Sequence, residues 1–136
     1  MRWIVDGNNV MGAGADGWWR DPVAAAGRLT RALDDWAATH DDAVVVVFDG
    51  RPEPSLARRA GGRLSVEFAR RPGRDAADDR IVELVAAEPG PATDLRVVTS
   101  DRGLAGRLPP GVAVEGAGRF RERLGMPLPS RRHGRR

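Results

Sequence analysis

Residues 43–48 read AVVVVF, a continuous apolar run without alternating polar residues. A strand with one face in water alternates apolar and polar residues, so an unalternated run favours a strand that is buried on both faces. Such strands are typical of parallel sheets covered by helices on each side. Further apolar runs occupy residues 3–5, 64–68, 95–98 and 112–114. The sequence therefore predicts five buried strands.

Helical patterns separate these strands. Asp21 suits the N-cap of a helix and Pro22 its first position. The apolar residues that follow at helical spacing are Ala26, Leu29, Leu33 and Trp36. Further helices are predicted over residues 75–87, directly after Asp101, and around residues 120–124. This alternation predicts a three-layer α/β sandwich with right-handed crossovers.

Composition limits the possible chemistry. The length of 136 residues suits one domain, which we expect over residues 1–126, followed by a flexible Pro/Arg-rich tail at 127–136. The chain has no Cys and two His, which excludes disulfides and a zinc site of thiolates and imidazoles. All 22 basic residues are Arg, and Lys is absent. No signal-like start or membrane-length apolar run occurs, so we expect a cytoplasmic protein.

Carboxylates follow three of the predicted strands, with Asp6 and Asp49 directly after their strands and Asp101 three residues after Val98. Ligands of open parallel sheets bind beyond the carboxyl ends of the strands, so we expect these residues to share one edge of the sheet. Taken singly, each has a structural alternative. Asp49 also suits a turn, and Asp101 also suits the cap of the next helix.

Other polar residues accompany these acids. After the first strand, we expect Gly7 to let the backbone turn, and the amides of Asn8 and Asn9 to orient a ligand or a water molecule. Thr99 and Ser100 have two open roles. Their hydroxyls either contact a metal-bound water or cap the following helix.

A fourth carboxylate, Asp78, lies in the helix predicted over residues 75–87. At roughly 100° per residue it falls about 50° from the centre of the apolar stripe, whereas Asp79 falls on the far side. Asp78 therefore leans toward the interior, where a carboxylate needs a cationic or hydrogen-bonding partner. The alternative is that Asp78 simply favours the first turn of the helix, with Asp75 as N-cap.

Four carboxylates at one edge would raise one another's pKa unless a divalent cation neutralised them. Oxygen ligands of this kind suit Mg²⁺ or Mn²⁺. One or two such ions can support phosphodiester hydrolysis. The acids therefore predict a metal-dependent hydrolytic site.

Four stretches, in order, resemble a known family. VDGNNV, VVVFDG, AADDRIVEL and VVTSD are similar to motifs of the NYN domain of the PIN-like (FLAP nuclease) superfamily, in its YacP-like ribonuclease branch. The resemblance covers residues 3–101. It implies a Rossmann-like, five-stranded parallel sheet in the order 3-2-1-4-5 and an endoribonuclease activity that depends on Mg²⁺ or Mn²⁺.

The resemblance also implies site residues. The catalytic positions that it implies are Asp6, Asp49, Asp78, Asp101 and Asn9, with the four Asp as metal ligands. Asn8 stands where the family usually has Tyr, and Glu83 is displaced by one residue from an accessory acid. The long C-terminal helical extension expected of the branch has no counterpart after the fifth strand. A ribosome association, which would be built on that extension, is therefore the weaker of the partners that the resemblance implies.

The implied substrate is RNA, which we expect to be single-stranded. Candidate phosphate-binding residues near the acids are Arg70, Arg71, Arg74 and Arg102. Trp18 and Trp19 follow the first strand and are candidates for stacking on an unpaired base. Packing of this pair over the end of the sheet is the alternative.

Other function classes share some of these features. A haloacid-dehalogenase-like phosphatase also begins at a strand-end Asp, but it needs an acid at the position of Asn8 and a Lys. The toxin of a toxin–antitoxin pair shares the superfamily fold, although the motif spelling favours the YacP-like branch. A non-catalytic RNA-binding or scaffold domain with the PIN-like fold is the remaining alternative.

Overall fold

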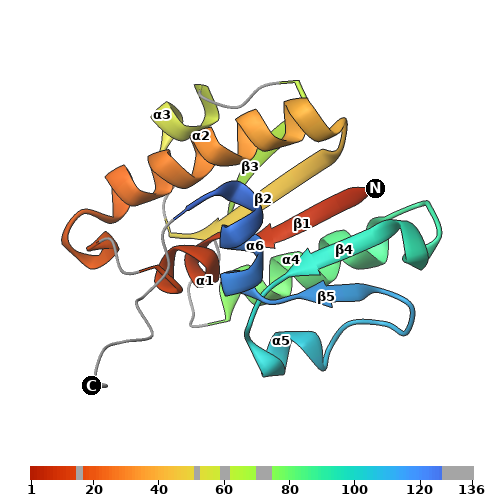
Figure 1. Cartoon of the computed structure of the whole chain (residues 1–136). Helices are drawn as coiled ribbons and strands as arrows, with labels where there is room; N and C mark the ends of the chain where they lie inside the picture. Colours follow the sequence, from red (N-terminus) through yellow and green to blue (C-terminus); the bar gives the residue numbers. More distant parts are fainter. Residues whose placement is uncertain (15–16, 51–52, 59–61, 70–74, 127–136) are drawn as a thin grey trace, which may run out of the picture.

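The computed structural model describes residues 1–14, 17–50, 53–58, 62–69 and 75–126 (Figure 1). Its sheet has five parallel strands in the order β3-β2-β1-β4-β5. The strands are β1 (Arg2–Asp6), β2 (Ala43–Asp49), β3 (Leu64–Ala69), β4 (Leu95–Val98) and β5 (Ala113–Glu115). The predicted PIN-like α/β fold and strand order are confirmed. The observed strand ends differ from the predicted ones by at most one residue. For example, β1 and β2 continue into Asp6 and Asp49.

Helical segments connect the strands. They are α1 (Gly7–Gly12), η1 (Trp18–Arg20), α2 (Pro22–His40), α3 (Pro54–Arg58), α4 (Ala76–Ala87), η2 (Ala92–Asp94), α5 (Arg102–Ala105) and α6 (Ala117–Leu124). The start of α2 is as predicted, since Pro22 is its first residue and the Asp21 side chain accepts a hydrogen bond from the N–H of Ala24 at 3.1 Å. Within the described ranges, no helix has the length and apolar character needed to cross a membrane.

Helices cover both faces of the sheet (Figure 1). Trp3 and Val5 of β1 lie in a core formed with α1, α2 and α6, whereas Ile4 lies in a second core formed with α4 and α5. The β2 residues divide in the same way, with Val46 in the first core and Val47 in the second. This division explains why the run at residues 43–48 has no polar alternation.

Helix α1 differs from the prediction. Residues 7–9 do not form a turn after β1 but the first turn of α1. Gly7 is buried, and a Cβ added to it would lie 2.6 Å from Cε1 of Phe48. Gly7 is not among the positive-φ glycines, so its role is the close approach of α1 to β2 rather than a turn.

Candidate active site

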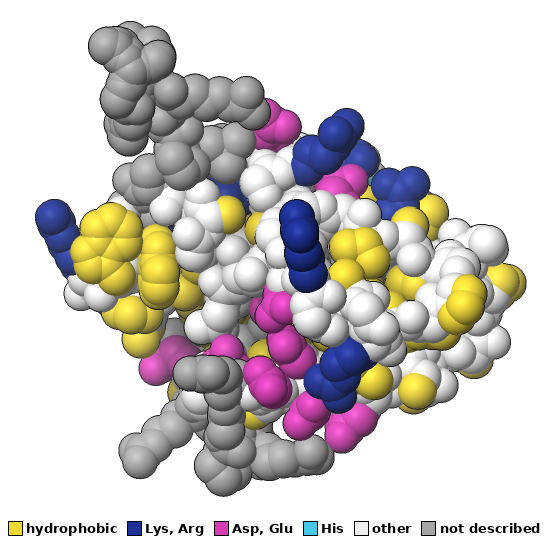
Figure 2. Space-filling view, turned by 90° about the horizontal axis from the view of Figure 1, so that it is seen from below, with side chains coloured by type: hydrophobic (Ala, Val, Ile, Leu, Met, Phe, Trp, Pro, Cys, Tyr) yellow, Lys and Arg dark blue, Asp and Glu magenta, His cyan; other side chains and the backbone are white. Residues whose placement is uncertain are grey.

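The carboxyl ends of β2, β1 and β4 bring acidic residues to one edge of the sheet. Asp6 and Asp49 end their strands, Asp101 follows β4, and α4 adds Asp78 in its first turn. The charges act on one another, because Asp78 and Asp49 affect the pKa of Asp6, while Asp101 and Asp49 affect the pKa of Asp78. Figure 2, viewed from below Figure 1, shows acidic side chains gathered near the middle of that face. We call Asp6, Asp49, Asp78 and Asp101 the acidic cluster.

Asp6 is the buried member of the acidic cluster. Its side chain is largely shielded from water, and this burial is the main reason that its pKa is raised to about 6. The nearby charges of Asp78 and Asp49 raise the pKa further. The hydroxyl of Thr99 opposes this effect by donating a hydrogen bond to Oδ2 of Asp6 at 2.9 Å.

Asp78 also has a pKa raised to about 6, chiefly through desolvation and then through the charges of Asp101 and Asp75. Arg107 opposes this shift. The same Arg107 forms an ion pair with Asp79, with 2.9 Å between Nη2 and Oδ1. Asp79, expected on the solvent side of α4, therefore has a cationic partner. Asp78 remains the α4 carboxylate that faces other acids.

Asp49 and Asp101 also cap helices. Oδ1 of Asp49 accepts a hydrogen bond from the N–H of Ala77 at 3.2 Å, at the start of α4. Asp75 occupies the N-cap position, as predicted, but its side chain makes no capping hydrogen bond. A distant strand end thus supplies the cap of α4. Capping fixes the position of Asp49 relative to α4 and brings it toward Asp78.

Asp101 caps helix α5, which is the structural role that the sequence also allowed for it. Its Oδ1 accepts hydrogen bonds from the N–H groups of Gly103 at 2.8 Å and Leu104 at 3.2 Å. Ser100 does not cap this helix, because its hydroxyl accepts a hydrogen bond from the N–H of Ala117 at 2.8 Å, at the start of α6. These bonds fix the loop that carries Asp101 beside the ends of β4 and β5.

The Asn8 and Asn9 amides connect neighbouring strand ends. Oδ1 of Asn8 accepts a hydrogen bond from the N–H of Asp49 at 2.8 Å, and Oδ1 of Asn9 accepts one from the N–H of Ser100 at 2.7 Å. We expected these amides to orient a ligand or a water molecule. Their oxygens bind the backbone on either side of β1, so both side chains position the loops that carry acids.

Thr99 has a role that sequence reasoning missed. Its hydroxyl joins two members of the acidic cluster, since it donates to Asp6 and accepts a hydrogen bond from the N–H of Asp101 at 3.0 Å. Thr99 is 2% exposed. The sequence did hold one signal for this role. Thr99 directly follows β4, and the strand order 3-2-1-4-5 places the end of β4 beside the end of β1, which carries Asp6.

The predicted substrate-binding residues fall into three groups. Arg70, Arg71 and Arg74 lie outside the described residues, as does the tail at 127–136. Arg102 is exposed and begins α5, next to Asp101. Trp18 packs partly against the core, as the structural alternative holds, whereas Trp19 is 57% exposed. Trp19 is therefore the more exposed ring of this pair.

The donor chemistry of the acidic cluster suits a hard divalent cation, because its ligands are carboxylate oxygens. Across the described part of the chain, no three acidic or His side chains form a ready-made metal site. An Mg²⁺ ion in a protein usually takes one or two carboxylates, with waters and substrate phosphates as its other ligands.

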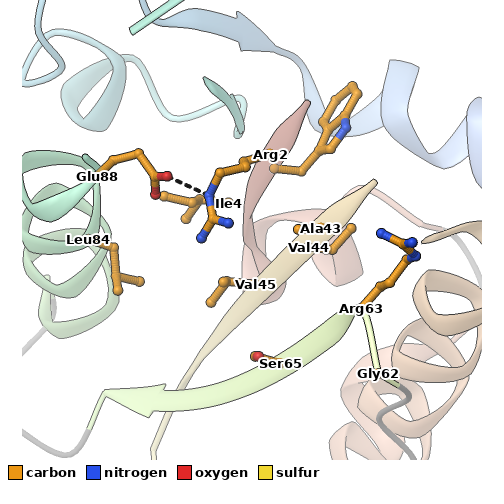
Figure 3. A pocket seen from close by; sticks show the side chains of 11 residues that line it. Arg2, Ile4, Ala43, Val44, Val45, Gly62, Arg63, Ser65, Leu84 and Glu88 are labelled. Carbon is orange, nitrogen blue, oxygen red and sulfur yellow. Dashed lines mark ion pairs between the residues drawn. The ribbon is translucent and has the colours of Figure 1, made fainter. Parts of the chain in front are cut away.

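A pocket of about 260 Å³ lies at the opposite, amino-terminal ends of β1, β2 and β3 (Figure 3). An ion pair between Nε of Arg2 and Oε1 of Glu88, 2.5 Å apart, lies at its side. Arg63, which also lines the pocket, pairs with Asp41. None of the acidic cluster lines this pocket, so it is separate from the candidate site.

Comparison with known proteins agrees with this geometry. The sequence model of the YacP-like NYN domain matches residues 3–107. A crystal structure of Rae1 (YacP) from Bacillus subtilis is 23% identical, with a TM-score of 0.72 over 92% of this chain and 74% of that chain. A variant of the same protein is 24% identical, with a TM-score of 0.71 over 91% and 74%. No curated protein matches. The structural likeness shows the fold, and the match over most of the sequence shows that the chain belongs to the YacP-like NYN domain family, a family of ribonucleases.

Proposed function

We propose that this protein is a metal-dependent endoribonuclease that hydrolyses phosphodiester bonds of single-stranded RNA at the acidic cluster. Membership of the family supports the reaction class. The observation that carries the proposal is that four carboxylates from separate elements act on one another at one edge of the sheet. Desolvation, and after it the charges of neighbouring acids, raises the pKa of Asp6 and of Asp78 to about 6. Mutual repulsion of this kind is unfavourable for folding, and a bound cation would relieve it.

The acidic cluster would hold Mg²⁺ or Mn²⁺ through its carboxylate oxygens. When bound, such an ion supplies Lewis-acid chemistry, which polarises a phosphodiester and makes water a better nucleophile. Asp6 brings a buried carboxylate that the Thr99 hydroxyl keeps oriented. Asp49 and Asp101 each use Oδ1 to cap a helix, so their carboxylates are held in place before substrate arrives.

The neighbouring residues have positioning and binding roles. Asn9 holds the backbone of Ser100, and through it the loop of Asp101, so we assign it a positioning role. Arg102 is placed to pair with an RNA phosphate, because it is exposed next to Asp101. Trp19 offers an exposed ring on which an unpaired base can stack.

Cleavage of a labelled single-stranded RNA with Mg²⁺ or Mn²⁺, beside a reaction in EDTA, tests the proposal. Asp6→Asn and Asp78→Asn should each lower kcat/KM by at least about 100-fold while the fold is kept. Asp35→Asn is the matched control, since Asp35 is an exposed carboxylate on α2 outside the acidic cluster.

The outcomes separate the alternatives. Metal-dependent cutting that is lost in both cluster variants and kept in Asp35→Asn supports the ribonuclease. Cutting that persists in both cluster variants contradicts the site. RNA binding without cutting of any tested sequence favours the non-catalytic RNA-binding domain.

A further inference from the structure

A second pocket, of about 360 Å³, lies over the carboxyl ends of β2 and β3 on the face covered by α2. We call it the Phe48 pocket. Phe68 of β3 provides a half-buried aromatic wall, and Phe48 of β2, which is only 3% exposed, lies against it with ring centroids 5.9 Å apart and planes tilted by 32°. Met11 of α1 and Val23 of α2 add apolar surface. The volume is in the range of small-ligand sites.

The Phe48 pocket adjoins the acidic cluster. Asp49 lines the pocket and also acts electrostatically on Asp6 and Asp78. Asn8 lines it too, and its Oδ1 is held by the N–H of Asp49. A group bound in the pocket is therefore next to the site at which we propose that a phosphodiester is cut.

The charges of the Phe48 pocket select the part of a nucleotide that fits. Its charged lining residues are Asp49 and Glu53, and no Arg is among the described residues that line it. Carboxylates that no cation neutralises repel a phosphate, so the pocket disfavours the sugar-phosphate backbone, which lies instead at the cation of the acidic cluster. A nucleobase is uncharged, has flat apolar faces that suit aromatic walls, and carries N–H donors on its edge.

The carboxylates also favour particular bases. Oε1 of Glu53 accepts a hydrogen bond from the hydroxyl of Ser55 at 3.0 Å, and Oδ1 of Asp49 accepts one from the N–H of Ala77. Among the described residues, none donates a hydrogen bond to Oε2 of Glu53 or to Oδ2 of Asp49. Ionised carboxylates only accept hydrogen bonds, so they favour guanine, adenine and cytosine, which have two or more N–H donors on the edge, over uracil, which has a single ring N–H.

We propose that the Phe48 pocket binds one unpaired nucleobase of the RNA, next to the phosphodiester at the acidic cluster, and prefers guanine, adenine or cytosine to uracil. This inference rests on the proposed function for its substrate class. It adds a specificity site that adjoins the acidic cluster and shares Asp49 with it. The pocket makes cleavage depend on the identity of one nucleotide.

The test is an abasic scan. Short fluorescent RNAs, each with one abasic nucleotide, are titrated with the protein in EDTA, and binding is followed by anisotropy. One abasic position should weaken binding by about tenfold, the effect of losing one stacked base. The same RNAs are then cut with Mg²⁺, which should place that position beside the cleaved bond.

Variants link the scan to the pocket. Phe68→Leu keeps apolar volume but removes one ring, and Ala26→Leu fills the pocket from α2, since Ala26 lines it. Both should reduce the abasic effect to less than about twofold. Ala24→Leu makes the same change as the second variant at an exposed position of α2 outside the pocket, and should keep the wild-type effect.

A second series varies the base at the sensitive position. Amino-bearing bases should bind more tightly than uracil, and Glu53→Gln should reduce that preference. The pocket proposal is overturned if no abasic position weakens binding, or if the abasic effect has the same size in wild type, Phe68→Leu and Ala26→Leu. Either result leaves the ribonuclease proposal intact. A pocket-dependent scan without cutting overturns the catalytic proposal alone. Failure of every RNA both to bind in EDTA and to be cut with Mg²⁺ overturns both.

Discussion

Replacing Thr99 with Val tests how the acidic cluster is held. The Thr99 hydroxyl donates to Oδ2 of Asp6 at 2.9 Å and accepts from the N–H of Asp101 at 3.0 Å, in a side chain that is almost fully buried. Val has a similar shape but can form neither bond. Leaving these groups without their partner should lower the free energy of unfolding by about 1–3 kcal/mol.

The same substitution should change the pH dependence of cleavage. The Thr99 hydrogen bond lowers the pKa of Asp6 from the value that burial would set, so its loss raises that pKa above the wild-type value of about 6. If cleavage needs ionised Asp6, the acid limb of the kcat/KM profile moves to higher pH. The variant should therefore lose more activity near pH 6 than near pH 8.

The assay combines urea unfolding with initial rates of RNA cleavage from about pH 5 to about pH 9 at fixed Mn²⁺. Thr99→Ser retains the hydroxyl and should restore the wild-type acid limb. Thr30→Val is the matched control, because Thr30 is also buried but its hydroxyl donates to the carbonyl oxygen of Ala26 within α2. It should leave the acid limb unchanged. A folded Thr99→Val protein with the wild-type acid limb would refute the reasoning.

Three further predictions concern stability. Gly7→Ala should lower the free energy of unfolding by about 1–3 kcal/mol, because the new Cβ would lie 2.6 Å from the Phe48 ring. Gly12→Ala is the control, because its new Cβ would lie 3.8 Å from the nearest atom, in Trp18, and the change should be neutral or stabilising. Equal urea midpoints for the Gly7→Ala and Gly12→Ala proteins would contradict the close-approach argument. Asp6→Asn should be more stable than wild type above about pH 6. The pKa of Asp6 in the folded protein, about 6, exceeds the ordinary value of 3.8. Protonation of Asp6 therefore stabilises the folded wild-type protein fully below about pH 4, and this stabilisation is lost as the pH rises through about 6. A stability difference between Asp6→Asn and wild type that stays constant from about pH 4 to about pH 7 would oppose this linkage. Finally, Mn²⁺ at 100 times its Kd should stabilise the wild-type protein by about 2.7 kcal/mol, measured as a rise in Tm, and an equal rise in Asp6→Asn would argue against a site at Asp6.

Much of the fold follows from local sequence patterns. The run at residues 43–48 predicts a strand because both of its faces must be covered, and Asp21 followed by Pro22 predicts the start of α2 because each suits its place at a helix N-terminus. These patterns do not fix the order of the strands, which came from the resemblance to a family. They also missed α1, since Gly and Asn are poor helix formers. The absence of a side chain at Gly7 lets the first turn of that helix lie against Phe48.

The candidate site divides in the same way. The sequence by itself determined that Asp6, Asp49 and Asp101 reach one edge, because the carboxyl ends of parallel strands share an edge. Only the tertiary structure decided their surroundings. Asn9 binds the backbone of Ser100, 91 residues away, because β4 lies beside β1. The raised pKa of Asp6 likewise comes from burial and from charges on other elements, which a residue's neighbours in the chain do not specify.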